Sequence, residues 1–192
     1  MRQIKCFFLE RIEQTRYSLR RYVSGSQCTC AGGHGYHDAS VHLCDGDEPA
    51  KPDRNDPRWP TKCAHCDYVF TPADQWQVFP ESLYRAADGT IMTLRSAPAG
   101  AMWFADWMPN DWKGPDGHSL MVKTPGGDWG VDMRASNCTR PDDKVHKCWV
   151  RHGDPRTANV TVDKNGDTCN AGAGSILCGA YHGFLRGGFL ED

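Results

Sequence analysis

The stretch Cys63-Ala64-His65-Cys66 carries the strongest structural signal in this 192-residue chain. In a Cys-x2-Cys loop, two thiolates can converge on one ion at about 2.3 Å while backbone N–H groups point at the sulfurs. The alternative, a redox-active Cys-x2-Cys motif, requires a strand before it and a helix that starts at its second cysteine. Pro60 precedes this motif, and the helix expected nearby starts only at Pro72. The motif therefore favours half of a tetrahedral, structural zinc site.

The segment 28–44 offers six candidates for the two remaining ligands, and the sequence leaves their identity open. Three glycines lie between Cys28 and His37 and supply the backbone freedom for a loop that folds back. We therefore expect a first zinc site at Cys28, His37, Cys63 and Cys66. The other four candidates are Cys30, His34, His42 and Cys44.

A second group of metal-binding residue types lies in the C-terminal half. Cys138, His146 and Cys148 form a Cys-x7-His-x-Cys arrangement, which is compatible with metal binding but not diagnostic. Cys169, in a loop rich in Asn, Gly and Ala, is the expected fourth ligand of this second zinc site. The alternatives are a Cys138–Cys148 disulfide or buried thiols, since cysteine behaves as a small hydrophobe. His182 is a reserve ligand for either site.

The composition is typical of a chain whose fold depends on metal sites or disulfides. Leu, Ile, Val and Phe supply only 30 of the 192 residues, below the roughly 20% expected of an ordinary globular core. A net charge of −2, with seven Trp and six Tyr, argues against disorder. Ten Cys, 20 Gly and 12 Pro describe a loop-rich chain of the kind usually held together by disulfides or metal.

The N-terminal sequence bears on the choice between disulfides and metal. Its longest apolar run, residues 6–9, is too short for a signal peptide. We therefore expect a reducing compartment, where cysteines are metal ligands or catalytic groups more often than disulfide partners.

Periodicity and turn residues predict a β-rich chain. Apolar or alternating runs predict strands, and Asp-Gly and Pro-Gly-Gly turns predict two hairpins. Residues 10–15 would join the first two strands as a turn or a short helical turn, and residues 24–60 would form a long loop organised by metal. The expected strands cover 3–9, 16–23, 159–162 and 181–185, and the hairpin turns cover 86–89 and 124–128.

One short helix is expected after the Cys63 motif. Thr71 would be its N-cap, Pro72 its first residue and Asp74 part of a capping box, and it would end by Phe79. The fold class is thus α+β and β-rich: a single compact, loop-rich domain over residues 1–192, stapled by structural zinc. Sub-lobes at 1–80 and 81–192 would each hold one Cys/His cluster.

Several functional classes find little support. No stretch of 18 apolar residues exists, so no membrane span is expected. A pI near 6.4 argues against a dedicated nucleic-acid binder, and the basic N-terminal region is expected to be a solvated strand face. No His-Glu-x2-His, zinc-deaminase, Gly-x-Ser-x-Gly or phosphate-loop motif occurs. Trp103, Trp107 and Trp112, beside two methionines, indicate either core or a partner-binding patch.

Eight stretches spread over nearly the whole chain carry a resemblance to a known family. They are IKCFFLER (4–11), SLRRY (18–22), YHDA (36–39), DPRWPT (56–61), APAGAMW (97–103), KTPGGDW (123–129), CWVRHG (148–153) and YHGFLR (181–186). In these the chain resembles uncharacterised, small, zinc-binding-like proteins of tailed bacteriophages and prophages. The resemblance implies a phage-encoded protein made in the host bacterial cytoplasm. It favours His37 as a ligand, while Cys30, Cys44 and Cys178 depart from the pattern.

The expected function is non-enzymatic: a zinc-stabilised protein that acts through protein–protein interaction with a host or phage partner. One alternative is a virion component, either a decoration or a tail-associated protein. Another is a zinc-dependent hydrolase or nuclease, in which His65 or Asp67, or else His146 and His152, would carry the chemistry. Nucleic-acid binding is the weakest alternative, and no membrane partner is expected.

Overall fold

The computed structural model describes residues 2–23, 36–143, 145–163, 169 and 175–192. Contacts between Cα atoms divide the chain into two compact units. Unit 1 comprises Met1–Arg11 and Tyr84–Asp192, and unit 2 comprises Ile12–Leu83. The expected single domain with sub-lobes divided near residue 80 stays a prediction, although one unit boundary lies at Leu83.

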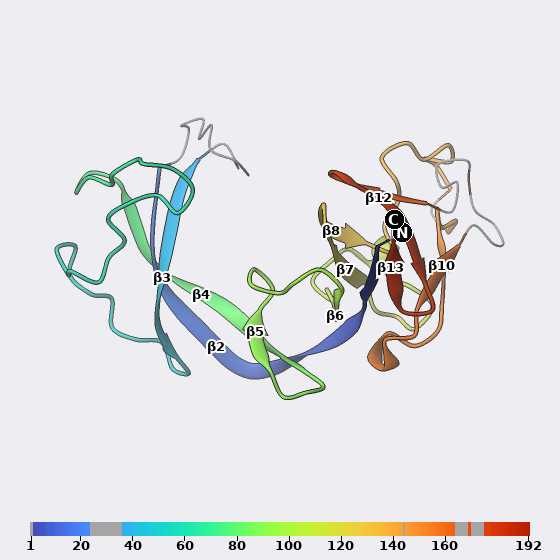
Figure 1. The fold of residues 1–192 in the computed structure, drawn as a ribbon, viewed down its shortest axis with the longest axis horizontal. Coiled ribbons are helices and arrows are strands. Elements are labelled where there is room, and N and C mark those ends of the chain that lie inside the picture. The colour runs from blue at the N-terminus through green and yellow to red at the C-terminus, as the bar shows by residue number, and fades with distance from the viewer. Residues whose placement is uncertain (1, 24–35, 144, 164–168, 170–174) are drawn as a thin grey trace. The chain divides into compact units, whose positions relative to one another are not determined.

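The described residues are strand-rich, as expected, and contain no α-helix (Figure 1). Thirteen strands are accompanied by two three-residue 3-10 turns, η1 (Asn110–Trp112) and η2 (Pro155–Thr157). The α+β prediction is therefore confirmed only in its β-rich part.

Unit 2 is built on one long strand, β2 (Phe7–Val23), which enters it from unit 1. Strand β3 (His37–Asp45) pairs antiparallel with β2 from Arg16 opposite Asp45 to Val23 opposite His37. Strand β4 (Gln75–Ala86) also pairs with β2. The pairing places His37, the first residue of β3, opposite Val23 at the end of β2.

Two expectations for the first 60 residues are wrong. Residues 10–15 form neither a turn nor a helix but the middle of β2, because they contain no Gly, Pro, Asn or Asp to break the strand. Each half of β2 also has its own partner: Phe7 and Phe8 pair with β6, and the second half pairs with β3. Part of the expected loop 24–60 is the nine-residue strand β3.

The expected helix at 71–79 is also absent. Its capping chemistry forms locally: the Asp74 carboxylate accepts the N–H of Thr71 at 2.6 Å, and the Asp74 N–H donates to the Thr71 carbonyl. The result is a single turn, after which β4 begins at Gln75. A cap only starts a turn; here pairing with β2 and the β-favouring residues Trp76, Val78 and Phe79 make the next residues a strand.

Unit 1 contains three sets of paired strands, and the two predicted hairpins are present in it. The β4–β5 turn closes with an Ala86 N–H to Thr90 carbonyl bond, and β7 and β8 pair from Met121–Gly130 to Thr124–Gly127. The sets are β6-β7-β8 beside the start of β2, β1-β13-β12-β11, and β9-β10. The strands are β1 (Gln3–Lys5), β5 (Ile91–Thr93), β6 (Ala101–Phe104), β7 (Leu120–Thr124), β8 (Gly127–Gly130), β9 (Val150–His152), β10 (Thr161–Asp163), β11 (Ile176–Cys178), β12 (Tyr181–Arg186) and β13 (Phe189–Glu191).

The buried core is distributed unevenly between the units. Unit 1 holds two large apolar clusters, which include Trp103 at 2% exposure. The cluster at the Cys63 loop in unit 2 has only Ala39, Cys63 and Phe70 as fully buried members. Of the three tryptophans whose role the sequence leaves open, Trp103 belongs to the core whereas Trp107 is 60% exposed.

Candidate metal centres

Four metal-binding side chains converge in unit 1, and they are the four expected from the sequence. One ligand atom each from Cys138, His146, Cys148 and Cys169 lies within 4.8 Å of the other three. The Cys169 Sγ atom is 3.9 Å from Cys138 Sγ and 3.6 Å from Cys148 Sγ. The His146 Nε2 atom is 3.4 Å from Cys138 Sγ and 3.7 Å from Cys148 Sγ.

These separations match those of a tetrahedral ion. With zinc bonds of about 2.3 Å to sulfur and about 2.05 Å to nitrogen, a tetrahedron separates sulfurs by about 3.8 Å and sulfur from nitrogen by about 3.6 Å. A disulfide would instead bring two sulfurs to about 2.05 Å. All three cysteines are free thiols, so the alternative Cys138–Cys148 disulfide is not formed.

Backbone N–H groups and one arginine hold the ligand loops of this cluster. The Ala135 N–H donates to Cys148 Sγ at 3.3 Å, and the Arg140 N–H donates to Cys138 Sγ at 3.4 Å. The Arg134 guanidinium donates to the carbonyls of Arg140, Pro141 and Asp143, in the loop between the first two ligands. The sulfurs of Cys138 and Cys148 therefore each accept a backbone N–H, which favours the thiolate form.

Three of the four side chains are deeply buried, whereas Cys138 is half-buried, and burial raises the pKa of Cys148. Exposure is 0% for Cys148, 2% for His146 and 3% for Cys169. Burial raises the pKa of Cys148 to about 12, so this thiol stays protonated at neutral pH unless a cation replaces the proton. A divalent metal supplies that positive charge and deprotonates a coordinating thiol outright.

In unit 2, three of the four expected ligands come together. His37, Cys63 and Cys66 each place a ligand atom within 4.8 Å of the others, and His37 Nδ1 is 3.3 Å from Cys66 Sγ. Cys28, the expected fourth ligand, lies outside the described residues, as do the open candidates Cys30 and His34.

A short hairpin positions the two cysteines of this second cluster. Lys62 and Val69 form a β-bridge, and the Cys63 N–H donates to the Tyr68 carbonyl at 2.9 Å. The His65 N–H points at Cys63 Sγ at 3.4 Å, as expected for a Cys-x2-Cys knuckle. The ring of Tyr68 stacks on His37 with centroids 4.1 Å apart and fixes the imidazole beside the sulfurs.

The electrostatics of Cys63 differ from those of Cys148. Burial raises the pKa of Cys63, but hydrogen bonds from the backbone of His65 and Asp38, and from His37 and Cys66, outweigh it and lower the pKa to about 7. This site therefore favours a thiolate before any ion is added, which is the form that binds metal.

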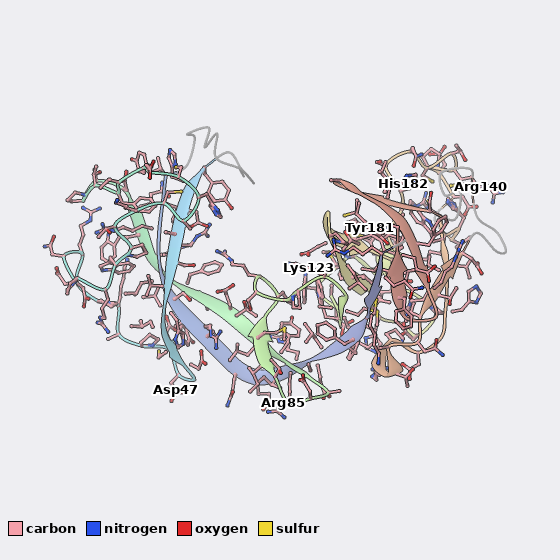
Figure 2. The ribbon with its side chains drawn as sticks, in the orientation of Figure 1. Asp47, Arg85, Lys123, Arg140, Tyr181 and His182 are labelled. Carbon is pink, nitrogen blue, oxygen red and sulfur yellow. The ribbon has the colours of Figure 1, made fainter. Side chains whose placement is uncertain are left out.

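The remaining candidates lie apart from both clusters. On β3, His42 Nε2 contacts Asp45 at 3.1 Å and Cys44 is a free thiol. On β12, Tyr181 is buried while the next residue, His182, is exposed and contacts Ser175 at 3.2 Å (Figure 2). Alternation along the strand thus keeps the reserve ligand out of either cluster.

The sequence reasoning missed the residues that support the ligands. Asp143 accepts the N–H groups of Val145 and His146 and thereby orients that ligand; an Asp two to three residues ahead of a ligand is a local turn signal that could have been found. The role of Arg134 has no such signal, because it bonds only to backbone carbonyls. His152, a candidate catalytic partner of His146 in the hydrolase alternative, instead contacts Asp163.

No protein-family model, curated protein or solved structure matches the chain. In the described residues, no helix has the length and apolar character needed to cross a membrane. The interpretation of both clusters therefore depends on the geometry of the residues themselves.

Proposed function

We propose that this chain is a protein with two structural zinc centres that acts through protein–protein interaction rather than catalysis. The observation that carries the proposal is the tetrahedral spacing of Cys138, His146, Cys148 and Cys169 in a buried cluster. Four protein ligands leave no open coordination position for substrate or water, which is the arrangement of structural rather than catalytic zinc.

The donor set supports zinc over other common ions. Three thiols and one imidazole are soft or borderline ligands, which suit zinc, whereas calcium and magnesium prefer carboxylate and carbonyl oxygens. The described part of the chain contributes no carboxylate to either cluster. Zinc in such sites contributes on the order of 10 kcal/mol to folding.

A second candidate function belongs to the unit 2 cluster. Three described ligands, of which His37 and Cys66 are only half-buried, are also the number found in catalytic zinc sites. If Cys28 is not a ligand, a water on the fourth position would make a zinc-dependent hydrolase the alternative. The exposed side chains of His65 and Asp67 lie next to the ligands in sequence and would be its general acid or base.

The experiment that tests the proposal counts metal and identifies its ligands. Native mass spectrometry of untagged protein should show two zinc ions per chain. Cobalt substitution should give the visible spectrum of tetrahedral cobalt with strong thiolate charge transfer at both sites. Cys148→Ser should bind one ion fewer, whereas Cys178→Ser, a free thiol outside both clusters, should keep both ions.

Three results would contradict the proposal. A well-folded protein without metal would exclude structural zinc. Equal metal content in Cys148→Ser and in wild type would exclude the unit 1 cluster. A five-coordinate cobalt spectrum at the unit 2 cluster would favour the hydrolase.

The phage origin implied by the resemblance stays a prediction. The host or phage partner, the cytoplasmic location and the virion alternative stay predictions with it.

A further inference from the structure

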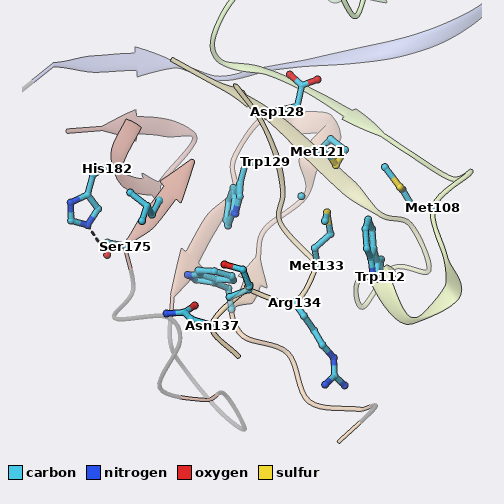
Figure 3. A pocket seen from close by; sticks show the side chains of 15 residues that line it. Met108, Trp112, Met121, Asp128, Trp129, Met133, Arg134, Asn137, Ser175 and His182 are labelled. Carbon is cyan, nitrogen blue, oxygen red and sulfur yellow. Dashed lines mark hydrogen bonds between the residues drawn. The ribbon is translucent and has the colours of Figure 1, made fainter. Parts of the chain in front are cut away.

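Unit 1 also contains a cavity of about 690 Å³ that none of the candidate ligands in the two metal clusters lines (Figure 3). Its size falls within the range of about 300–1,000 Å³ that is typical of small-molecule sites. Three tryptophans and three methionines dominate its lining: Trp112, Trp129, Trp149, Met108, Met121 and Met133. Indole faces and thioether sulfurs both make favourable contacts with aromatic rings.

The aromatic wall of this Trp/Met pocket is closely packed. Trp129 and Trp149 are each 8% exposed, and their rings meet edge to face with centroids 5.5 Å apart. The Met133 sulfur packs over Gly130, where any side chain would collide with it. In Figure 3, Met133 lies between Trp129 and Trp112, and these side chains define the apolar part of the pocket.

The polar part of the lining indicates what kind of substituent a ligand carries. Ser175 and His182 hydrogen-bond to each other at 3.2 Å at one rim, where Leu177 is 75% exposed. The two permanently charged lining residues are already engaged. Asp128 pairs with Lys123 at 3.1 Å, and Arg134 donates to the carbonyls of the metal loop. The Asp128 carboxylate is thus paired with a cation, and the Arg134 guanidinium points toward the metal loop and away from Trp129 and Trp112 (Figure 3), so the lining presents hydrogen-bonding groups rather than a charge to the interior.

One wall of the pocket is part of the chain that carries the metal ligands. Asn137 directly precedes Cys138, and Trp149 directly follows Cys148. The N–H of Ala135, another lining residue, donates to the Cys148 sulfur. Loss of the ion would loosen these segments, because an ion bound to all four side chains would tie the 135–138 and 146–149 segments to each other.

We propose that the Trp/Met pocket binds an uncharged aromatic compound with one hydrogen-bonding substituent, and that the unit 1 metal centre holds the pocket in its binding shape. The rings of the ligand lie against the tryptophans and methionines, and its substituent faces the Ser175–His182 rim. Only the dependence on metal rests on the proposed function; the pocket itself does not.

The test uses two fluorescent probes that differ by one charge: N-phenyl-1-naphthylamine, which is neutral and has one N–H, and its 8-sulfonate. The neutral probe should bind the purified full chain with one-to-one stoichiometry and at least tenfold more tightly than the sulfonate. Trp112→Ala should weaken its binding at least tenfold. The matched control Trp107→Ala removes an exposed tryptophan that does not line this pocket, and should change binding less than twofold.

A second variant covers the case in which Trp112→Ala does not fold. Leu177→Ser changes a rim residue that is 75% exposed, so the variant should fold normally. It should weaken the binding of the neutral probe at least threefold. Any of three results would contradict the assignment of this pocket as the binding site. They are an equal loss of probe affinity in Trp112→Ala and Trp107→Ala, an unchanged affinity in Leu177→Ser, and binding of several probes per chain. Binding of the sulfonate as tight as that of the neutral probe would overturn the choice of an uncharged ligand.

The dependence of probe binding on zinc is tested separately. Removal of zinc should abolish the binding that depends on Trp112, and added zinc should restore it. If the protein contains zinc and its removal leaves binding unchanged, the metal dependence is wrong. If the protein contains no zinc, the proposed function fails, while the comparison of the tryptophan variants still decides the pocket.

Discussion

Arg151 is almost entirely inside unit 1, with 2% of its side chain exposed. Its guanidinium bonds the carboxylates of Asp132 at 3.1 Å and Asp116 at 2.7 Å and 2.9 Å. Asp132, itself 5% exposed, also accepts the N–H of Leu120. A carbon atom added to Gly114 would lie 2.0 Å from the guanidinium, so any other residue there would displace the buried Arg151–Asp132 pair. This network links the 114–118 turn to strands β7 and β9.

The network predicts a specific dependence of stability on pH. Burial raises the pKa of Asp116, but the Arg151 guanidinium and the His118 N–H outweigh it and lower the pKa from 3.8 to about 2. Ionised Asp116 therefore stabilises the fold above pH 4, and this contribution is lost as the pH falls toward 2. Its size is about 1–2 kcal/mol, reduced by solvent because 30% of the side chain is exposed.

Asp116→Asn should remove this contribution while leaving Asp132 in place. Burial raises the pKa of Asp132, so its own effect on stability has the opposite sign. Urea unfolding from pH 2 to 6 should show a stability difference between wild type and Asp116→Asn that shrinks as the pH falls. Asp47→Asn, an exposed carboxylate in unit 2, is the control. A difference that stays constant with pH would contradict the assignment.

At the scale of elements, two hairpin turns in unit 1 depend on backbone contact. Gly126, in the β7–β8 turn, faces the β11–β12 turn so closely that an added carbon would lie 1.8 Å from the Cys178 carbonyl oxygen. Gly179 in the opposite turn has φ +55 and meets the Gly126 carbonyl in the same way. The Pro-Gly-Gly sequence predicted a turn, but the need for glycine here comes from the neighbouring hairpin.

Gly126→Ala should therefore destabilise the protein by about 3 kcal/mol, since backbone on both sides must move apart. Gly89→Ala is the matched control in the β4–β5 turn, where open space surrounds the added carbon and only its φ of +87 is unfavourable. It should cost about 1 kcal/mol. Urea unfolding should show a larger loss of stability in Gly126→Ala than in Gly89→Ala. Equal losses would show that the β7–β8 and β11–β12 turns can move apart without a penalty.

At the scale of the whole molecule, the two units differ in how much of their stability apolar burial can supply. In the described part of unit 2, the fully buried apolar residues are Leu19, Ala39, Trp59, Cys63, Phe70 and Leu83. One of them, Cys63, is itself a candidate ligand. Unit 1 has two larger clusters, one of which includes the candidate ligands Cys148 and Cys169 among many other apolar residues. A small core of this kind usually needs a disulfide or a bound metal to fold.

Metal removal should therefore affect the units unequally. In hydrogen–deuterium exchange, chelation should remove amide protection from β3 and the 62–69 hairpin first, because candidate metal ligands lie in both. Strands β6 and β7, which carry the unit 1 core residues Met102, Trp103 and Val122, should keep protection longer. Readdition of zinc should restore protection in unit 2. Uniform loss over both units, or no loss in β3, would contradict this interpretation.

Local chemistry determined what the sequence could predict. The Cys-x2-Cys knuckle and the Asp-Gly and Pro-Gly-Gly turns are formed by neighbouring residues, and the structure has a short hairpin at Cys63 and both predicted hairpins. The β-rich character comes from alternating apolar residues. The grouping of Cys138, His146, Cys148 and Cys169 came from residue type and local context: the Cys-x7-His-x-Cys spacing and the loop rich in Asn, Gly and Ala around Cys169.

Only the tertiary structure decided the rest, because those features depend on partners far along the chain. Most of the segment 71–79, expected as a helix, belongs to strand β4 because its backbone pairs with β2. Residues 10–15, expected as a turn, belong to β2 for the same reason. The tetrahedral spacing of four side chains separated by up to 31 residues, and the pocket beside them, exist only once the strands of unit 1 are packed. Spacing along a sequence limits which groups can meet, whereas distances in space are set by packing.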